Sequence, residues 1–157
     1  MTRLISACLL GIPCRYDGRA KGLSEAQLDI LSREHTLVPI CPEIYGGLPT
    51  PRVPAEISDG RVVNRDGEDV TREYELGAEA GLRISEVTGA QGAYLMARSP
   101  SCGVHEVYDG TFTGKLIPGQ GITARKLGEA GLELYSVDPA MTLEALTQLI
   151  QRDDSKD

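Results

Sequence analysis

The sequence predicts a single α/β domain in which helices cover both faces of a mainly parallel, Rossmann-like sheet, with two small hairpins beside it. Its length of 157 residues suits one domain. Short apolar runs alternate with segments of helical periodicity, which is typical of parallel strands joined by right-handed helical crossovers. Two Asp-Gly pairs, each inside a short β-prone segment, indicate the hairpins.

The first third of the chain supplies two buried strands and one helix. Leu4–Leu10 is an apolar run that stops at Gly11-Ile12-Pro13, as expected of a strand that opens into a loop. Ser24 and Gln27 have the spacing of a capping box, which predicts a helix after them. Thr36–Cys41 is the second predicted strand, and Pro42 ends it.

The middle of the chain is irregular before it becomes helical. Residues 42–55 contain four Pro and two Gly, which predicts a long loop of a kind that is more often functional than connecting. Glu56–Asn64, centred on Asp59-Gly60, is the first predicted hairpin. A long helix is expected from about Asp69 to Val87. Its predicted apolar stripe consists of Leu76, Ala80, Leu82, Ile84 and Val87.

The last third of the chain alternates strand and helix again. The predicted elements are a third strand at Gly92–Ala97, a second hairpin over Glu106–Leu116, a helix at Ile122–Glu129, a fourth strand at Leu132–Ser136 and a helix capped by Thr142. The polar segment 152–157 is expected to form a frayed tail of this single domain, which spans residues 1–157.

Composition excludes several classes of function. Sixteen Lys and Arg against 23 Asp and Glu give a net charge of -7, which argues against a nucleic acid polymer as the main partner. No apolar run approaches the roughly 20 residues of a membrane span, and the N-terminus lacks the features of a secretion signal. We therefore expect a cytoplasmic protein with no membrane partner, although a local basic pocket for one small anion remains compatible with this charge.

The four cysteines are the most informative residues, because structural disulfides are rare in a reducing cytosol. Cys8, Cys41 and Cys102 each lie at the carboxyl end of a different predicted strand. The carboxyl ends of parallel strands meet at one edge of a sheet, so the topology is expected to bring these three thiols to one rim. Cys14 lies in the loop after the first strand, and it could be a ligand, a substrate contact or an ordinary loop thiol.

Cysteines in this pattern suit an iron–sulfur cluster better than zinc. Structural zinc sites usually contain close CxxC pairs, and this sequence has none. A [4Fe-4S] cluster prefers thiolates and accepts them from separate loops. Three thiolates would leave one iron open as a Lewis acid, whereas four would close the cluster and suggest electron transfer.

Two polar residues are tied by sequence to the proposed ligands. Glu43 follows Cys41 by two residues and Ser101 directly precedes Cys102, so a carboxylate and a hydroxyl are available for proton transfer. A local cationic cluster in this acidic chain is either a solvated turn or a receptor for an anionic substrate group such as a phosphate. The cluster consists of Arg15, Arg19 and Lys21.

Six short blocks of sequence follow one another in a recognisable order. The blocks are Ser6–Gly11 (SACLLG), Cys14–Gly18 (CRYDG), Cys41–Glu43 (CPE), Gly46–Arg52 (GGLPTPR), Arg98–Gly103 (RSPSCG) and Tyr108–Gly114 (YDGTFTG). Together they resemble the small bacterial and archaeal family to which the thiouracil desulfidases belong. The resemblance covers the chain from residue 4 to about 136. It implies an iron–sulfur enzyme that removes sulfur from thiolated uracil or its nucleotide without net redox change.

The resemblance also implies roles for individual residues. The family's [4Fe-4S] cluster is held by three cysteines only, and its free iron binds the sulfur of the substrate. Carried over to this sequence, the resemblance implies that the ligands are Cys8, Cys41 and Cys102. Because Cys14 also matches a family block, the choice of these three cysteines over Cys14 depends on the strand-end argument. Glu43 and Ser101 match the positions that handle water activation and proton transfer.

The predicted function is therefore the hydrolytic, [4Fe-4S]-dependent desulfuration of 4-thiouracil or its nucleotide to uracil and hydrosulfide. The alternative is a non-catalytic iron–sulfur or zinc-binding protein for sensing or storage. Iron and sulfide quantification separates iron from zinc, and a hydrosulfide assay separates the enzyme from the binding protein.

Overall fold

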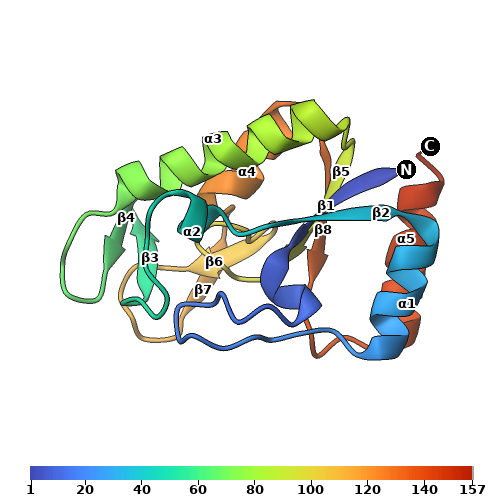
Figure 1. The fold of residues 1–157 in the computed structure, drawn as a ribbon. Coiled ribbons are helices and arrows are strands. Elements are labelled where there is room, and N and C mark those ends of the chain that lie inside the picture. Colours follow the sequence, from blue (N-terminus) through green and yellow to red (C-terminus); the bar gives the residue numbers. More distant parts are fainter. Residues whose placement is uncertain (157) are drawn as a thin grey trace.

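A four-stranded sheet between two layers of helices forms the centre of the protein (Figure 1), as shown by a computed structural model that describes residues 1–156. All of its strand pairs are parallel, which confirms the predicted sheet. In spatial order the strands are β2 (Thr36–Ile40), β1 (Thr2–Ser6), β5 (Gly92–Met96) and β8 (Glu133–Val137).

Helices cover both faces of the sheet, as predicted. One face packs against α1 (Glu25–Glu34) and α5 (Leu143–Asp154), and the other against α3 (Thr71–Thr88) and α4 (Ile122–Glu129). Side chains alternate along a strand, so neighbouring residues of β1 and β5 enter opposite cores and both strands are continuously apolar. Within residues 1–156, the helices lack the length and apolarity needed to cross a lipid bilayer.

The apolar run Leu4–Leu10 does not form one strand, which corrects the prediction. Strand β1 ends at Ser6, and the chain turns into a short 3₁₀ helix, η1 (Ala7–Leu10), that closes at Gly11 with a φ of 91°. The side chain of Ser6 accepts a hydrogen bond of 2.9 Å from the backbone N–H of Met96, which links the ends of β1 and β5. Apolar content alone cannot separate a buried strand from a buried helical turn.

A short helix, α2 (Pro42–Tyr45), interrupts the segment predicted as an irregular loop. Pro42 occupies its first turn, where the missing N–H costs nothing. Two glycines allow α2 to lie directly on α3, because a Cβ at Gly77 would overlap the carbonyl group of Pro42 and one at Gly46 would overlap that of Glu73. Close backbone contact therefore determines where α2 lies.

The predicted apolar stripe of α3 is buried only in part, because Leu82 and Ile84 pack against the core but the two ends of the stripe do not. Leu76 and Val87 are 41% and 69% exposed. The buried residues are instead Thr71, Tyr74, Gly77, Ala78, Gly81 and Ser85. The close approach of neighbouring elements selects small residues here, and hydrophobic periodicity does not reveal such a face.

Both predicted hairpins are present, and they contact each other. The first pairs β3 (Ala55–Ser58) with β4 (Arg61–Asn64) around the predicted Asp59-Gly60 turn. The second pairs β6 (Glu106–Tyr108) with β7 (Leu116–Pro118), so its Asp-Gly pair opens a longer loop, 109–115, instead of a two-residue turn. In Figure 1 the hairpins lie near α2, away from α1 and α5.

The C-terminal segment is ordered well beyond the predicted start of the frayed tail. Helix α5 continues to Asp154, and Asp153 is 1% exposed. Arg3 donates to Asp153 with an Nε–Oδ2 distance of 3.0 Å, and the Tyr94 hydroxyl donates at 2.6 Å. Fraying is therefore the wrong prediction for residues 152–154, because a buried ion pair fixes them. Asp157 lies outside the described residues.

Candidate active site

A cavity of about 420 Å³ opens at the carboxyl ends of three strands of the sheet. Ser6, Ile40 and Met96, the last residues of β1, β2 and β5, all line it. The chain passes from β1 to β2 on one side and then crosses to β5 on the other side of β1. Open α/β sheets bind ligands at such a reversal of strand order, so the topology alone places a binding site here.

All four cysteines line this cavity, and all four are free thiols. Cys8 lies in η1, Cys41 directly precedes α2, and Cys102 lies in the loop after β5. The structure thus brings together the three thiols that the strand-end argument selected. It adds Cys14, which arrives from the loop after η1.

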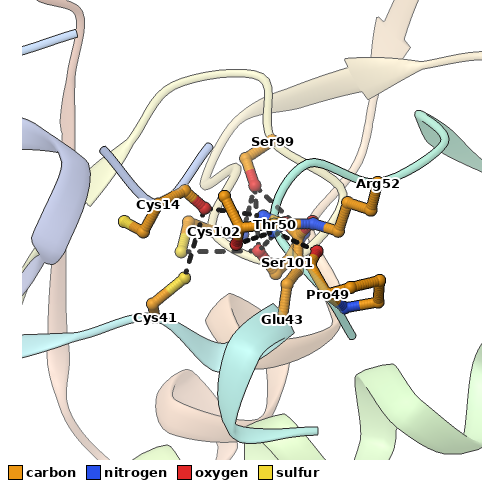
Figure 2. A network of polar contacts seen from close by, with 9 residues as sticks. All are labelled: Cys14, Cys41, Glu43, Pro49, Thr50, Arg52, Ser99, Ser101 and Cys102. Carbon is orange, nitrogen blue, oxygen red and sulfur yellow. Dashed lines mark hydrogen bonds and ion pairs between the residues drawn. The ribbon is translucent and has the colours of Figure 1, made fainter. Parts of the chain in front are cut away.

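The thiols are close enough to influence one another. The neighbouring Cys8 and Cys41 thiols both influence the pKa of Cys14, which is raised above its ordinary value. The Cys41 Sγ also lies 3.8 Å from the carbonyl oxygen of Cys14. Figure 2 shows the sulfur atoms of Cys14, Cys41 and Cys102 on the same side of the surrounding polar network. The four side chains therefore form one thiol cluster.

Two of the thiols, Cys41 and Cys102, hold their protons more tightly than a free cysteine does. Burial raises the pKa of Cys102 to about 12. The neighbouring Cys14 thiol, together with burial, raises the pKa of Cys41 well above its ordinary value. Binding of a metal to such thiols must displace their protons.

Glu43 and Ser101 are in direct contact at the edge of the thiol cluster. The Ser101 hydroxyl donates to Oε2 of Glu43 at 2.8 Å, and it lies 3.7 Å from Sγ of Cys102. Ser99 Oγ is 2.9 Å from Ser101 Oγ (Figure 2), which extends the chain of hydroxyl groups. Sequence reasoning placed Glu43 and Ser101 each beside its neighbouring cysteine, and the structure places them beside each other.

Arg52 is a site residue that the sequence reasoning did not select. Its Nε donates to Oε1 of Glu43 at 2.9 Å, and its Nη2 donates to the carbonyl oxygen of Cys14 at 2.9 Å. Its Nη1 donates to Thr50 Oγ1 at 3.1 Å and to the Pro49 carbonyl at 3.2 Å. The side chain is 6% exposed and joins α2 to the Cys14 loop. The sequence feature that could have indicated a role for Arg52 is its position in the Gly- and Pro-rich block 46–52.

Tyr74 of α3 is a second residue that was missed. It lines the cavity beside Glu43 and is 2% exposed. Burial and the neighbouring Glu43 carboxylate raise the pKa of Tyr74 above its ordinary value. Arg52, Ser101 and Tyr74 thus surround the carboxylate of Glu43. A tyrosine on a buried helix face carries no sequence signal that separates it from a core residue.

The predicted cationic cluster reaches the cavity only in part. Arg15 and Lys21 line it, whereas Arg19 does not. Arg15 also lies 3.5 Å from Asp17 and stacks over Tyr16. The structure adds Arg65 and Arg98 to the lining from distant parts of the sequence. The cavity is therefore rich in cationic side chains although the chain as a whole is acidic.

The donor set fits a cluster of metal ions better than a single ion. In the described part of the chain, no three His, Cys, Asp or Glu side chains surround one point as a single bound ion requires. The iron atoms of an iron–sulfur cluster lie several ångströms apart, so its thiolate ligands can be more widely spaced. Thiols that come from separate loops around one cavity match that requirement.

Comparison with known proteins places the chain in a family. Residues 4–138 match the 2-thiouracil desulfurase family. The chain belongs to this family. It is 42% identical over 143 residues to the uncharacterized protein YbbK of Bacillus subtilis (strain 168), an alignment that covers 85% of this chain and 93% of that protein.

A solved structure has the same fold over nearly the whole chain. It is described as the [4Fe-4S]-dependent thiouracil desulfidase TudS and matches with a TM-score of 0.87 at 40% sequence identity. The match covers 98% of this chain and 97% of that protein. The family resemblance carried by the sequence blocks and the α/β fold predicted from the alternation of strands and helices are both confirmed.

Proposed function

We propose that this protein is a [4Fe-4S]-dependent desulfidase that converts the thiocarbonyl group of a thiolated uracil, or of its nucleotide, into a carbonyl group. The reaction C=S + H₂O → C=O + H₂S is balanced without a gain or loss of electrons. The observation that carries the proposal is the direct contact of Glu43 and Ser101 beside the thiol cluster. Membership of the desulfurase family and the likeness to TudS support it.

The proposed cluster ligands are Cys8, Cys41 and Cys102. Cys8 lies in η1, which directly follows β1, and Cys41 lies between the end of β2 and the start of α2, so their positions depend on the sheet. The whole of η1 separates Cys14 from the end of β1, which supports its role as the thiol that is not a ligand. A [4Fe-4S] cluster held by three thiolates supplies a Lewis-acidic iron that can accept the sulfur of the substrate.

Glu43 is the proposed general base. Two protons must move from the attacking water to the departing sulfur, and a positioned carboxylate can accept the first of them. The Ser101 hydroxyl donates to Glu43. This hydrogen bond can reverse once Glu43 has accepted a proton, so Ser101 is proposed to relay that proton to the ring nitrogen of the substrate, from which it can pass to the departing sulfur. Ser101 and Arg52 occupy different oxygens of the carboxylate, and this fixes the orientation of Glu43.

Three cations have proposed supporting roles. Arg52 positions Glu43 and ties it to the Cys14 loop through one planar guanidinium group. Arg15 and Lys21 line the cavity and are proposed to receive the phosphate of a nucleotide substrate.

Four free thiols and a net charge of -7 favour a reducing, cytoplasmic location and argue against a nucleic acid polymer as partner.

Anaerobic purification followed by metal analysis tests this function. We expect iron and acid-labile sulfide in equal amounts, and hydrosulfide release from 2-thiouracil, 4-thiouracil or their nucleotides without an added reductant. Zinc in place of iron, or an intact cluster with no hydrosulfide release from any of these compounds, would favour the non-catalytic alternative. An absolute need for a reductant would move the protein to the redox enzymes.

A further inference from the structure

Phe112 has a backbone conformation that bulky residues rarely adopt. It is the only phenylalanine of the chain, and its φ is 58°, in the left-handed region. It lies in the loop 109–115 between β6 and β7 and lines the same cavity as the thiol cluster. Strained residues persist where their surroundings hold them, and they concentrate at functional sites.

Glu56 holds this strained loop in place. Its Oε1 accepts the backbone N–H of Gly110 at 3.0 Å and that of Phe112 at 3.1 Å. Gly110 has a φ of 94°, and a Cβ there would come within 2.9 Å of the Ile57 carbonyl oxygen and the Ser58 side chain. The loop therefore lies directly against β3. A carboxylate on one hairpin thus fixes the backbone of the other.

The ring of Phe112 is also oriented by a cation. The Arg65 guanidinium carbon lies 5.5 Å from the ring centroid, a cation–π distance. Arg65 follows β4 on the first hairpin, and its side chain lines the cavity together with Phe112. The two hairpins therefore contribute one planar cation and one planar ring to the cavity lining. The loops that follow the sheet strands contribute the thiols and the proton-transfer residues.

We propose that Phe112 is a specificity-determining residue whose ring packs against the pyrimidine ring of the substrate, and that Glu56 is the positioning residue that holds Phe112 there. The identity of the ring depends on the proposed function. Flat aromatic groups gain from offset stacking beyond the area they bury. This contact is equally available before and during the reaction, so it contributes to substrate binding more than to the chemical step.

Steady-state kinetics on cluster-loaded protein test the role of Phe112. Phe112→Leu is expected to raise KM for thiouracil roughly three- to tenfold, the effect of one aromatic pair, with little change in kcat. Phe112→Tyr keeps the ring and is expected to recover most of the binding. Ile117→Ala, which removes an apolar side chain from the same hairpin outside the cavity lining, is the matched control and should leave KM unchanged.

The same kinetic measurement tests whether Glu56 positions Phe112 or only stabilises the fold. Glu56→Ala should reproduce the KM increase of Phe112→Leu, whereas Glu56→Gln retains an oxygen that can accept both backbone N–H groups and should restore KM. Cluster absorbance should stay at the wild-type level in every variant. If Phe112→Leu does not fold, Phe112→Met, which keeps the apolar bulk without a ring, is expected to show the same increase.

A binding measurement keeps this inference separate from the desulfidase proposal. Ligand-observed NMR with uracil, which has no sulfur to bind iron, should give a weaker saturation-transfer signal with Phe112→Leu than with wild type. Wild-type KM and wild-type uracil binding in Phe112→Leu would overturn the inference, as would loss of the cluster together with kcat. If wild type releases no hydrosulfide, the desulfidase proposal fails, and the uracil signal alone decides whether Phe112 binds a pyrimidine ring.

Discussion

Replacing Arg52 by Met should destabilise the protein and misplace the proposed base. The substitution removes the ion pair with Glu43 and the hydrogen bond to the Cys14 carbonyl, and the two paired side chains are only 6% and 12% exposed. Removing one partner of a buried ion pair costs about 3–5 kcal/mol, because the remaining charge stays buried without compensation. Since Glu43 retains some exposure, we expect about 3 kcal/mol in the free energy of unfolding.

The thermal midpoint is a direct measure of this effect. For a chain of this size, about 3 kcal/mol corresponds to a fall of roughly 6–12 °C. Arg61→Met is the matched control, because Arg61 forms a 3.0 Å ion pair with Asp69 whose side chains are 60% and 46% exposed. The solvent screens such a pair, so this variant should unfold close to the wild-type temperature. Arg52→Lys, which keeps the charge without the planar fork, should lie between wild type and Arg52→Met.

Turnover of the same variants tests the positioning role. A carboxylate displaced by about 1 Å can lose up to roughly 10²-fold in rate, so Arg52→Met should lower kcat on that scale even when it is fully loaded with cluster. A double-mutant cycle with Glu43→Gln should be strongly non-additive, since both changes act through the same carboxylate. An Arg52→Met protein with wild-type thermal midpoint and wild-type kcat would refute the reasoning.

Three further predictions concern the ligands, the proton carriers and the buried ion pair. Alanine at any one of the three proposed ligands should abolish cluster absorbance after anaerobic reconstitution, whereas Cys14→Ala should keep most of it; the reverse pattern would change the assignment. Glu43→Gln or Ser101→Ala should leave cluster content near wild type while kcat falls roughly 10²–10⁴-fold, and an unchanged kcat would remove the residue from the mechanism. Burial opposes ionisation of Asp153, but hydrogen bonds from Arg3 and Tyr94 outweigh this effect and lower the pKa of Asp153. The ionised carboxylate therefore stabilises the folded protein fully at pH values above the ordinary Asp pKa of about 3.9. This stabilisation is lost as the pH falls through the lower pKa of the folded state. Urea unfolding should therefore show Asp153→Asn far less stable than wild type at neutral pH, with the difference shrinking in acid, and a constant difference would contradict this.

Local patterns in the sequence predicted most of the elements. The capping box at Ser24 and Gln27 is present in the structure with both of its hydrogen bonds, because such a motif needs only four consecutive residues. The Asp59-Gly60 turn is equally local. The predictions failed where burial depends on distant residues, as on α3, whose small-residue face follows from the close approach of α2, and at Asp153, whose partner Arg3 lies at the other end of the chain.

The candidate site was predictable only where general rules of sheet topology bring residues together. Parallel strands bring their carboxyl ends to one edge, so the gathering of thiols followed once four strands were recognised. The contact between Glu43 and Ser101 was not predictable, because it needs α2 to lie on α3 through Gly77. Arg52 could not be selected from the sequence, because its hydrogen bonds to Glu43, Cys14 and Thr50 form only after the loop 46–52 has folded back.

By itself the sequence determined most of the secondary-structure order, the parallel sheet, the family and the edge at which the cysteines collect. Each of these follows from short-range patterns or from topological rules that hold for any chain of this type. Only the tertiary structure decided which polar groups surround Glu43 and which cations reach the cavity, and it placed Phe112 and Arg65 among the lining residues. Those contacts join segments far apart in the sequence, and their distances depend on backbone packing that no local pattern encodes.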